Sequence, residues 1–241
     1  MIEKKIHYIW LGGNELPKIA KKCIKSWKKF CPDYEIIRWD ESNLNLDECK
    51  YARQAYDAKK YAFASDFLRF DILFKEGGIY LDIDVELLKP LDNYLNNEVF
   101  SGFETELNVA PGLIFGAEKG SSFVKEIIEN YKNREFIKNN EMDLTTVCKI
   151  VTGMLKEKGM KINNTEQVIE NIHIYPAEVF CPINPDTFVK KVTKNTVSIH
   201  HYNASWYEKK KGFKAFCKRV IKKIIGRKNA VKLANKMKKK K

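Results

Sequence analysis

The sequence lacks the cysteine, apolar and repeat patterns that mark several protein classes. Its six cysteines, at positions 23, 31, 49, 148, 181 and 217, include no C-x-x-C pair, and their spacings match neither a zinc site nor a small disulfide scaffold. We interpret them as reduced thiols of a cytosolic protein. The first residues include no apolar stretch long enough for a signal peptide or a membrane span. No internal repeat and no low-complexity linker precede residue 208.

The charge is uneven along the chain. The formal net charge is +13, yet residues 208–241 hold 16 Lys or Arg and one acid, whereas residues 1–207 carry 28 basic and 30 acidic side chains. The sequence therefore predicts a near-neutral domain at 1–207 and a basic tail at 208–241. With 241 residues, 44% of them hydrophobic, the chain is long enough for one large domain with its own core.

Strand-like and helix-like segments alternate along the domain. We expect strands near 5–10, 34–39, 79–81, 85–88, 99–103, 113–117 and 197–201, and helices near 19–30, 61–76, 123–131 and 144–158. The glycines at 77 and 78 are expected to cap the helix over 61–76. This alternation predicts an α/β domain with a largely parallel sheet, in which ligands gather at the carboxyl ends of the strands.

Two carboxylates follow a short apolar run at residues 77–84, which read Gly-Gly-Ile-Tyr-Leu-Asp-Ile-Asp. In extended backbone Asp82 and Asp84 would point to the same side of a strand end. Two like charges held that close favour a hard divalent cation, Mg²⁺ or Mn²⁺, between them. For these two acids alone, a solvated turn is the alternative interpretation.

A second pair lies in the preceding helix, where Asp66 and Arg69 are three residues apart and share a face. A surface ion pair is one interpretation. The neighbouring side chains are mostly apolar, however, so the helix is expected to be buried, and buried charges need a specific partner. An acid that binds sugar hydroxyls beside an arginine that binds a sugar or phosphate oxygen would meet that need.

Ser65-Asp66-x-x-Arg69 followed by residues 77–84 resembles the signature of the DXD-type glycosyltransferases of family 32. Their sugar-binding region is shared with the catalytic domains of the large clostridial glucosylating toxins. Residues 6–13, 111–120 and 200–206 resemble the first strand, the middle and the closing motif of that family, in the same order. The basic tail lies outside the resemblance.

The resemblance implies a GT-A type fold with a central, mostly parallel sheet and the transfer of a hexose, with retention at the anomeric carbon, from a nucleotide-sugar to a glycan acceptor. A UDP-sugar is the expected donor, and Mn²⁺ or Mg²⁺ the expected cofactor. The implied catalytic residues are Asp66, Arg69, Asp82 and Asp84.

Individual binding roles also follow from the resemblance. Trp10 would stack on the donor base, with a core tryptophan as the alternative. Asp66 and Arg69 would bind the donor sugar, Tyr80 would lie near the nucleotide, and Asp82 would contact the ribose and the metal. The expected metal ligands are Asp82, Asp84 and His201, and Ser205 and Trp206 are expected near the diphosphate. His200 is expected to point away from the site, because strand side chains alternate.

Retention requires either a covalent carboxylate intermediate or attack from the leaving-group side. Asp143 and Glu118 are candidate nucleophiles for the first route. Front-side attack, assisted by the departing phosphate, is our preferred hypothesis.

The tail carries apolar residues at 213, 216, 217, 220, 221, 224 and 225, which form one helical stripe flanked by basic side chains. This pattern favours binding to an anionic membrane surface, with packing on the domain as the alternative. Nucleic acid is not expected as a partner. We expect a cytoplasmic enzyme, peripheral to the inner face of the cell membrane, that acts on a glycan or lipid-linked glycan in capsular polysaccharide or lipopolysaccharide synthesis. The alternative function is a non-catalytic nucleotide-sugar or glycan-binding peripheral membrane module.

Overall fold

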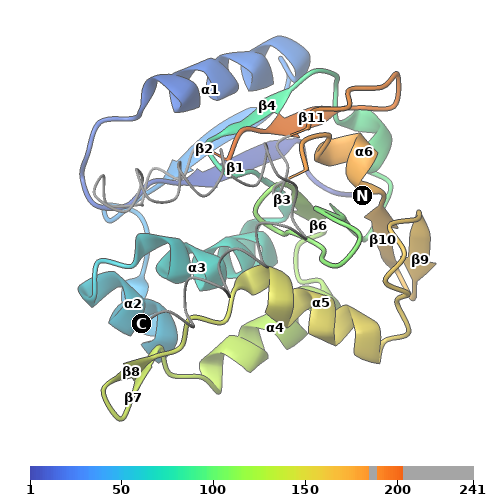
Figure 1. Cartoon of the computed structure of the whole chain (residues 1–241). Helices are drawn as coiled ribbons and strands as arrows, with labels where there is room; N and C mark the ends of the chain where they lie inside the picture. Colours follow the sequence, from blue (N-terminus) through green and yellow to red (C-terminus); the bar gives the residue numbers. More distant parts are fainter. Residues whose placement is uncertain (185–188, 203–241) are drawn as a thin grey trace, which may run out of the picture.

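A seven-stranded sheet forms the centre of the molecule in a computed structural model that describes residues 1–184 and 189–202 (Figure 1). Its strand order is β2-β1-β3-β6-β5-β10-β9. The strands are β1 (Lys5–Ile9), β2 (Glu35–Trp39), β3 (Gly78–Tyr80), β5 (Val99–Gly102), β6 (Phe115–Ala117), β9 (Gln167–Ile169) and β10 (Ile172–Tyr175). Five of the seven run in the same direction, whereas β6 and β9 run against their neighbours. The predicted α/β fold with a mostly parallel central sheet is confirmed.

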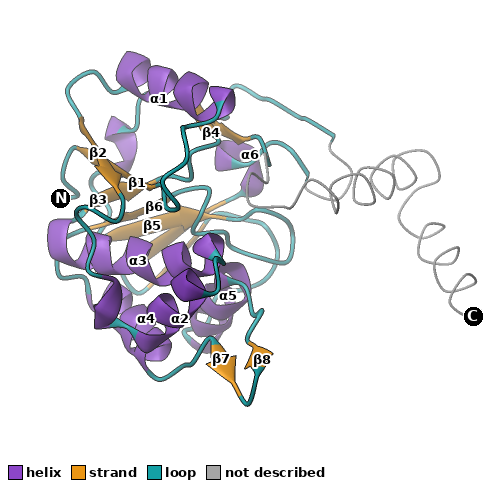
Figure 2. Ribbon diagram, turned by 90° about the vertical axis from the view of Figure 1, so that its left-hand side faces the viewer, coloured by secondary structure: helices purple, strands orange, loops and turns teal. Residues whose placement is uncertain are grey.

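Helices cover both faces of the sheet (Figures 1 and 2). One face carries α2 (Lys50–Asp57), α3 (Tyr61–Glu76), α4 (Ser122–Lys132) and α5 (Val147–Glu157). The other face carries α1 (Lys18–Phe30), α6 (Ala177–Phe180) and a two-stranded ribbon of β4 (Val85–Leu87) and β11 (Ser198–His200). Two separate apolar clusters fill the spaces between these layers.

Smaller elements complete the chain. They are the 3₁₀ turns η1 (Leu46–Glu48) and η2 (Asp92–Tyr94) and the short hairpin of β7 (Ile137–Lys138) and β8 (Glu141–Met142). Cys23, Cys31, Cys49, Cys148 and Cys181 are free thiols. Within the described residues, every helix is too short or too polar to cross a bilayer. Ser205, Trp206 and the predicted amphipathic tail at 208–241 lie outside the described residues.

The junction between α3 and β3 is fixed by glycine and histidine. Gly77 ends α3 with a φ of +64°, and its N–H donates to the carbonyl of Leu73 at 2.9 Å, as the sequence predicts for a glycine cap. Nε2 of the buried His7 donates to the carbonyl of Gly77 at 2.8 Å, and its Nδ1 accepts from the indole N–H of Trp39 at 3.0 Å. Burial lowers the pKa of His7 to about 4, so the ring is neutral and ties β1 and β2 to the start of β3.

Candidate sugar-binding site

Asp66 and Arg69 lie on the buried face of α3, and their side chains are only 11% and 4% exposed. Nη2 of Arg69 donates to Oδ1 of Asp66 at 2.8 Å, and its Nε donates to the carbonyl of Ser65 at 3.0 Å. The interpretation of this pair as a surface ion pair is therefore wrong. Burial raises the pKa of Asp66 to about 7, against the opposing effect of the Arg69 charge.

Arg69 links α3 to the end of β3. Its guanidinium lies over the ring of Tyr80, 4.7 Å from the centroid, and its Nη1 lies 3.9 Å from Oδ1 of Asp82. The hydroxyl of Tyr80 donates to the same Asp82 oxygen at 2.9 Å. Among the described residues, Nη1 of Arg69 has no hydrogen-bond partner, so it keeps N–H groups that could donate to a ligand oxygen.

The paired aspartates follow β3, as predicted, but they lie in a turn, which corrects the prediction of extended backbone at the strand end. β3 ends at Tyr80, and the N–H of Val85 donates to the carbonyl of Asp82 at 3.0 Å. The N–H of Asp82 donates to Gly112 at 2.8 Å, away from the strand ladder. Burial raises the pKa of Asp82, and Asp84 adds to the rise. The two carboxylates therefore influence each other although they are not aligned by extended backbone.

His200, the last residue of β11, and His201, which follows it, point in the directions opposite to those predicted. Nε2 of His200 lies 3.2 Å from Oδ1 of the buried Asp84. Nε2 of His201 bonds instead to Glu86 at 2.8 Å. The two side chains point to opposite sides of the strand, as predicted. The sequence alone does not indicate which of the two histidines points toward the aspartates. Burial favours the neutral ring of His200, yet Asp84 and Asp82 together raise its pKa.

Gly112 is a site residue that the sequence analysis did not single out as such. A Cβ built there would lie 2.3 Å from Oδ2 of Asp82 and 2.9 Å from Nη1 of Arg69. The hydrogen bond from Asp82 to its carbonyl requires this close approach. A glycine that follows a proline in the middle of the chain was the available signal, but only the fold brings it to the aspartates.

We expect Gly112→Ala to lower the free energy of unfolding by about 1–3 kcal/mol, because the new methyl group must displace Asp82 or Arg69. Gly153→Ala is the matched control: a Cβ there meets nothing within 4 Å, and alanine favours the helix α5. Urea unfolding of both variants measures the difference. Equal stabilities would contradict the close contact at Gly112.

Trp10 follows β1 directly and is half-buried, so the alternative of a core tryptophan is wrong. Its N–H continues the pairing with β2 by donating to Trp39 at 2.9 Å, and its indole donates to the carbonyl of Asn14 at 2.6 Å. Because His7 pairs with Tyr80 in parallel register, Trp10 and Asp82 leave the sheet at the same edge.

One of the two candidate nucleophiles, Glu118, lies away from the aspartate turn. Glu118 follows β6, which runs antiparallel to β3 with Ala117 opposite Gly78, so it leaves the sheet at the edge opposite to Asp82. Its carboxylate contacts the N-terminal ammonium group. Asp143 is paired with Arg134 beyond the β7–β8 hairpin. The position of Glu118 removes it as a nucleophile at the Asp82 site.

The carboxylate oxygens of Asp82 and Asp84 suit a cation whose remaining ligands come from a bound substrate. Over residues 1–184 and 189–202, no three His, Cys, Asp or Glu side chains gather as a metal-binding group. Magnesium, however, is often bound by one or two carboxylates and completed by substrate phosphates and water. Asp82 and Asp84 supply that partial set, and the unpartnered Nη1 of Arg69 lies 3.9 Å from Oδ1 of Asp82. The residues therefore fit a divalent ion that arrives with a phosphorylated ligand.

Comparisons with known proteins agree with this geometry. Residues 17–101 match the model of the family described as glycosyltransferase sugar-binding region containing DXD motif. The chain is 29% identical over 133 residues to inositol phosphoceramide mannosyltransferase 3 of Schizosaccharomyces pombe, covering 54% of this chain and 37% of that protein. It is 30% identical over 126 residues to an initiation-specific alpha-1,6-mannosyltransferase of Candida albicans, covering 48% and 32%. The match thus spans about a third of the length of each of these two relatives.

A similar fold is found in a solved structure, the PaToxG glycosyltransferase. The TM-score is 0.50 at 22% identity, over 66% of this chain and 70% of that one. The matched family segment contains Asp66, Arg69, Asp82 and Asp84, whereas Trp10, Gly112 and the two histidines lie outside it. Residues 17–101 are therefore similar to the sugar-binding region of DXD-type glycosyltransferases, and the chain has a GT-A type α/β fold.

Proposed function

We propose that the chain is a metal-dependent, retaining hexosyltransferase that uses a nucleotide-sugar, with a UDP-sugar as the expected donor. One observation carries the proposal: the buried Arg69 lies between Asp66 and Asp82 and keeps Nη1 unpartnered, beside the aspartate turn at the edge of the sheet. The mannosyltransferases among the relatives support a hexose as the transferred group.

In this proposal Asp66 accepts hydrogen bonds from donor-sugar hydroxyls, and Nη1 of Arg69 donates to a sugar or phosphate oxygen. Trp10 offers its partly exposed ring to the base at the same sheet edge. Asp82 and Asp84 would hold the divalent ion, which when bound would supply neutralising charge for the departing diphosphate. His200 positions Asp84 through their 3.2 Å contact.

Front-side attack accounts for retention without a carboxylate nucleophile. The bond between the anomeric carbon and the diphosphate oxygen breaks, and the acceptor hydroxyl oxygen bonds to that carbon from the same side. The hydroxyl proton passes to the departing phosphate oxygen. The position of Glu118 at the opposite sheet edge favours this route over a covalent intermediate.

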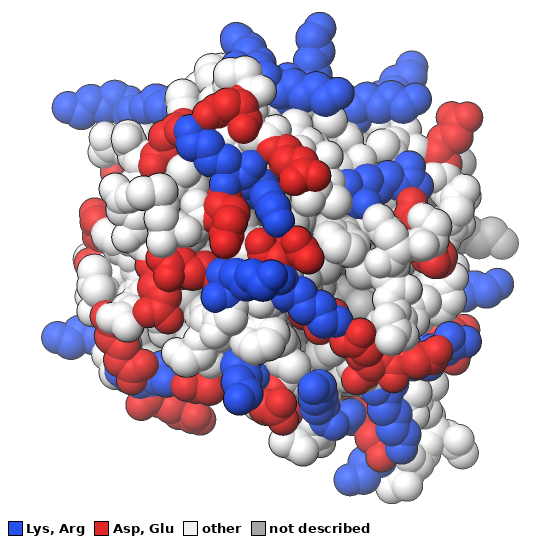
Figure 3. All heavy atoms as spheres, turned by 180° about the vertical axis from the view of Figure 1, so that it is seen from behind, with Lys and Arg blue, Asp and Glu red and all other residues white. Residues whose placement is uncertain are grey.

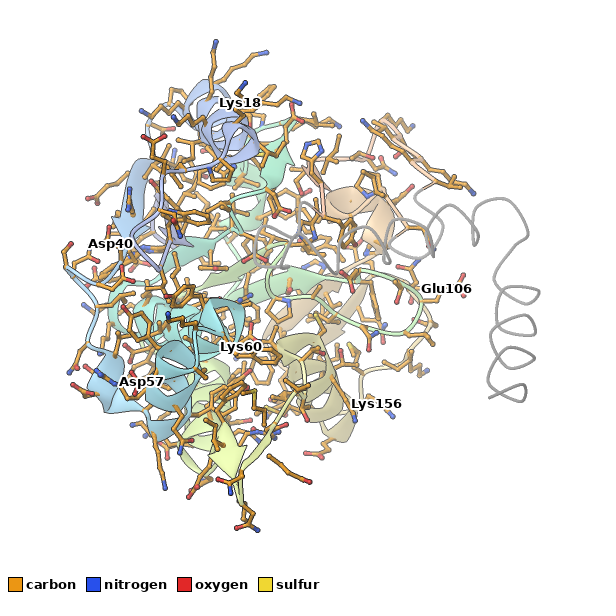
Figure 4. The ribbon with its side chains drawn as sticks, turned by 60° about the vertical axis from the view of Figure 1, so that its left-hand side comes forward. Lys18, Asp40, Asp57, Lys60, Glu106 and Lys156 are labelled. Atoms are coloured by element: carbon orange, nitrogen blue, oxygen red, sulfur yellow. The ribbon has the colours of Figure 1, made fainter. Side chains whose placement is uncertain are left out.

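The acceptor would enter through a cleft of about 710 Å³ beside the aspartate turn, whose lining includes Glu104, Glu106, Asn108, Glu178 and Lys191. Glu104 is near enough to His200 to contribute to the raised pKa of that ring, so the cleft adjoins the site. Figure 4 places Glu106 on the outer side of the molecule. Carboxylate and amide side chains suit the hydroxyls of a glycan.

We further propose the setting predicted from the sequence: a cytoplasmic enzyme at the inner face of the cell membrane that extends a glycan or lipid-linked glycan of a capsular polysaccharide or lipopolysaccharide. The second candidate is a non-catalytic nucleotide-sugar or glycan-binding membrane module. The intact set of Asp66, Arg69, Asp82 and Asp84 favours the enzyme.

Thermal-shift measurements on the full chain with UDP- and GDP-linked hexoses, each with Mn²⁺ or with EDTA, test the proposal. We expect one UDP-hexose to raise Tm when Mn²⁺ is present, by an amount that grows with its concentration. A rise only with GDP-hexoses would reject the UDP donor, and no manganese-dependent rise with either class would reject the site. Cation-assisted binding without release of the nucleoside diphosphate or product would favour the binding module.

A further inference from the structure

The outer face of α1 carries a stripe of six exposed lysines, which we call the lysine stripe: Lys18, Lys21, Lys22, Lys25, Lys28 and Lys29. They recur at helical spacings of three and four residues, so they lie on one face. The opposite face packs inward through Ala20, Cys23 and Trp27. No acidic residue occurs between Lys18 and Phe30. Figure 3 shows basic side chains along the upper edge of the molecule, at the height of α1 in Figure 1.

This concentration of charge contrasts with residues 1–207 as a whole, which carry 28 basic and 30 acidic side chains. Like charges three and four residues apart destabilise a helix. The first turn of α1 also holds lysine and no acid, which opposes the helix dipole. Among the described residues, Lys22 is the only member of the stripe with an ion-pair partner, Glu86 at 2.7 Å. Within the part of the chain that the structure describes, only Lys22, through Glu86, and Lys28 and Lys29, in the last turn where positive charge suits the helix dipole, gain from the fold, and the other three lysines of the stripe add repulsion alone.

Polyanionic partners offset such repulsion. We infer that the lysine stripe is a contact surface for the anionic headgroups of a lipid bilayer. All six residues are lysines, whose compact, hydrated charge suits a diffuse layer of headgroups, whereas arginine is preferred for bidentate phosphate recognition in nucleic acids. The stripe follows a single convex helix, so its charges can approach a flat surface together.

Hydrogen bonds connect the helix of the lysine stripe to the strand that follows the sugar-binding site. The indole N–H of Trp27 donates to the carbonyl of Val85 at 2.7 Å, and the N–H of Leu87 donates to Oγ of Ser26 at 2.9 Å. α1 is thus fastened to β4, the strand that follows Asp84 directly. A bilayer on the lysine stripe would lie on the outer side of the layer that contains β4. The inference does not depend on the proposed transfer reaction, since vesicle binding needs no donor.

Vesicle co-sedimentation of the full chain tests the inference, with phosphatidylcholine vesicles that contain 30 mol% phosphatidylglycerol or none. The variant is Lys21→Gln/Lys25→Gln/Lys28→Gln. The control, Lys125→Gln/Lys149→Gln/Lys156→Gln, removes three positive charges from α4 and α5 instead. Both variants keep the basic tail at 208–241 unchanged. Figure 4 shows Lys156 far from Lys18. We expect the α1 variant to lose about 10- to 100-fold in affinity for the anionic vesicles, and the control to lose much less.

A charge-retaining variant, Lys21→Arg/Lys25→Arg/Lys28→Arg, should bind anionic vesicles as the parent chain does. The glutamine variant of α1 should have an equal or higher Tm, because repulsion is relieved. Equal losses in the α1 variant and the control would overturn the inference. So would a larger loss of affinity for a 20-base-pair DNA duplex than for the vesicles at the same salt concentration, because the stripe would then be a nucleic-acid surface.

Discussion

Asp84→Asn is expected to lower kcat for sugar transfer by about 100- to 1,000-fold while leaving the fold intact. Asparagine keeps the shape of the side chain, so its Oδ1 can keep the 3.2 Å contact with Nε2 of His200. It removes the negative charge that a divalent ion would need. The loss should therefore appear together with a loss of the manganese-dependent rise in Tm on addition of the nucleotide-sugar.

Glu86→Gln is the matched control for that substitution. Glu86 lies two residues further along the chain and is paired with Lys22 and His201, away from the aspartate turn. We expect this variant to retain its turnover and its response to manganese. Full activity of Asp84→Asn, or equal losses in the two variants, would show that the carboxylate of Asp84 has no special role.

Arg69→Met is expected to lower the free energy of unfolding by about 3–5 kcal/mol. The substitution leaves the buried Asp66 and the partly buried Asp82 without the positive charge that lies between them. The double variant Arg69→Met/Asp66→Asn should recover part of the loss, because one of the uncompensated carboxylates is then neutral. Arg53→Met is the control, since Arg53 is exposed and its pairs with Asp47 and Asp57 lie in solvent.

The cost of Arg69→Met should also depend on pH. The folded-state pKa of Asp66, about 7, lies above its ordinary value of 3.8. Its contribution to stability is therefore fully present below pH 3.8 and is lost as the pH rises through 7. Without Arg69 that pKa rises further, so the variant should lose more stability than the parent chain between pH 5 and pH 8. Urea unfolding at both pH values measures this, and a deficit that shrinks with rising pH would contradict the buried pair.

Local sequence was sufficient to predict the part of the site that lies on one helix. Spacing alone places Asp66 and Arg69 on one face of α3, apolar neighbours predict their burial, and glycine predicts the end of the helix at Gly77. These features depend on contacts within a few residues, which a single sequence contains.

The remainder of the site depends on distant segments. β3 ends before the aspartates because the N–H of Asp82 donates to Gly112, thirty residues later in the chain. The directions in which the side chains of His200 and His201 point follow from the antiparallel pairing of β11 with β4, two strands that are more than one hundred residues apart in the sequence. The reversed direction of β6 likewise places Glu118 at the wrong edge for a nucleophile. The periodicity of apolar residues along the sequence does not predict any of these three arrangements.

The pairing of β11 with β4 also bears on how the protein matures. His200 reaches Asp84 only after the segment up to residue 202 has been synthesised, although the seven strands of the central sheet are complete by Tyr175. A nascent chain on the ribosome could therefore form its main sheet before the aspartate turn acquires its imidazole neighbour. Competence to capture the activated donor would then be gained only after the strands of the central sheet have been made.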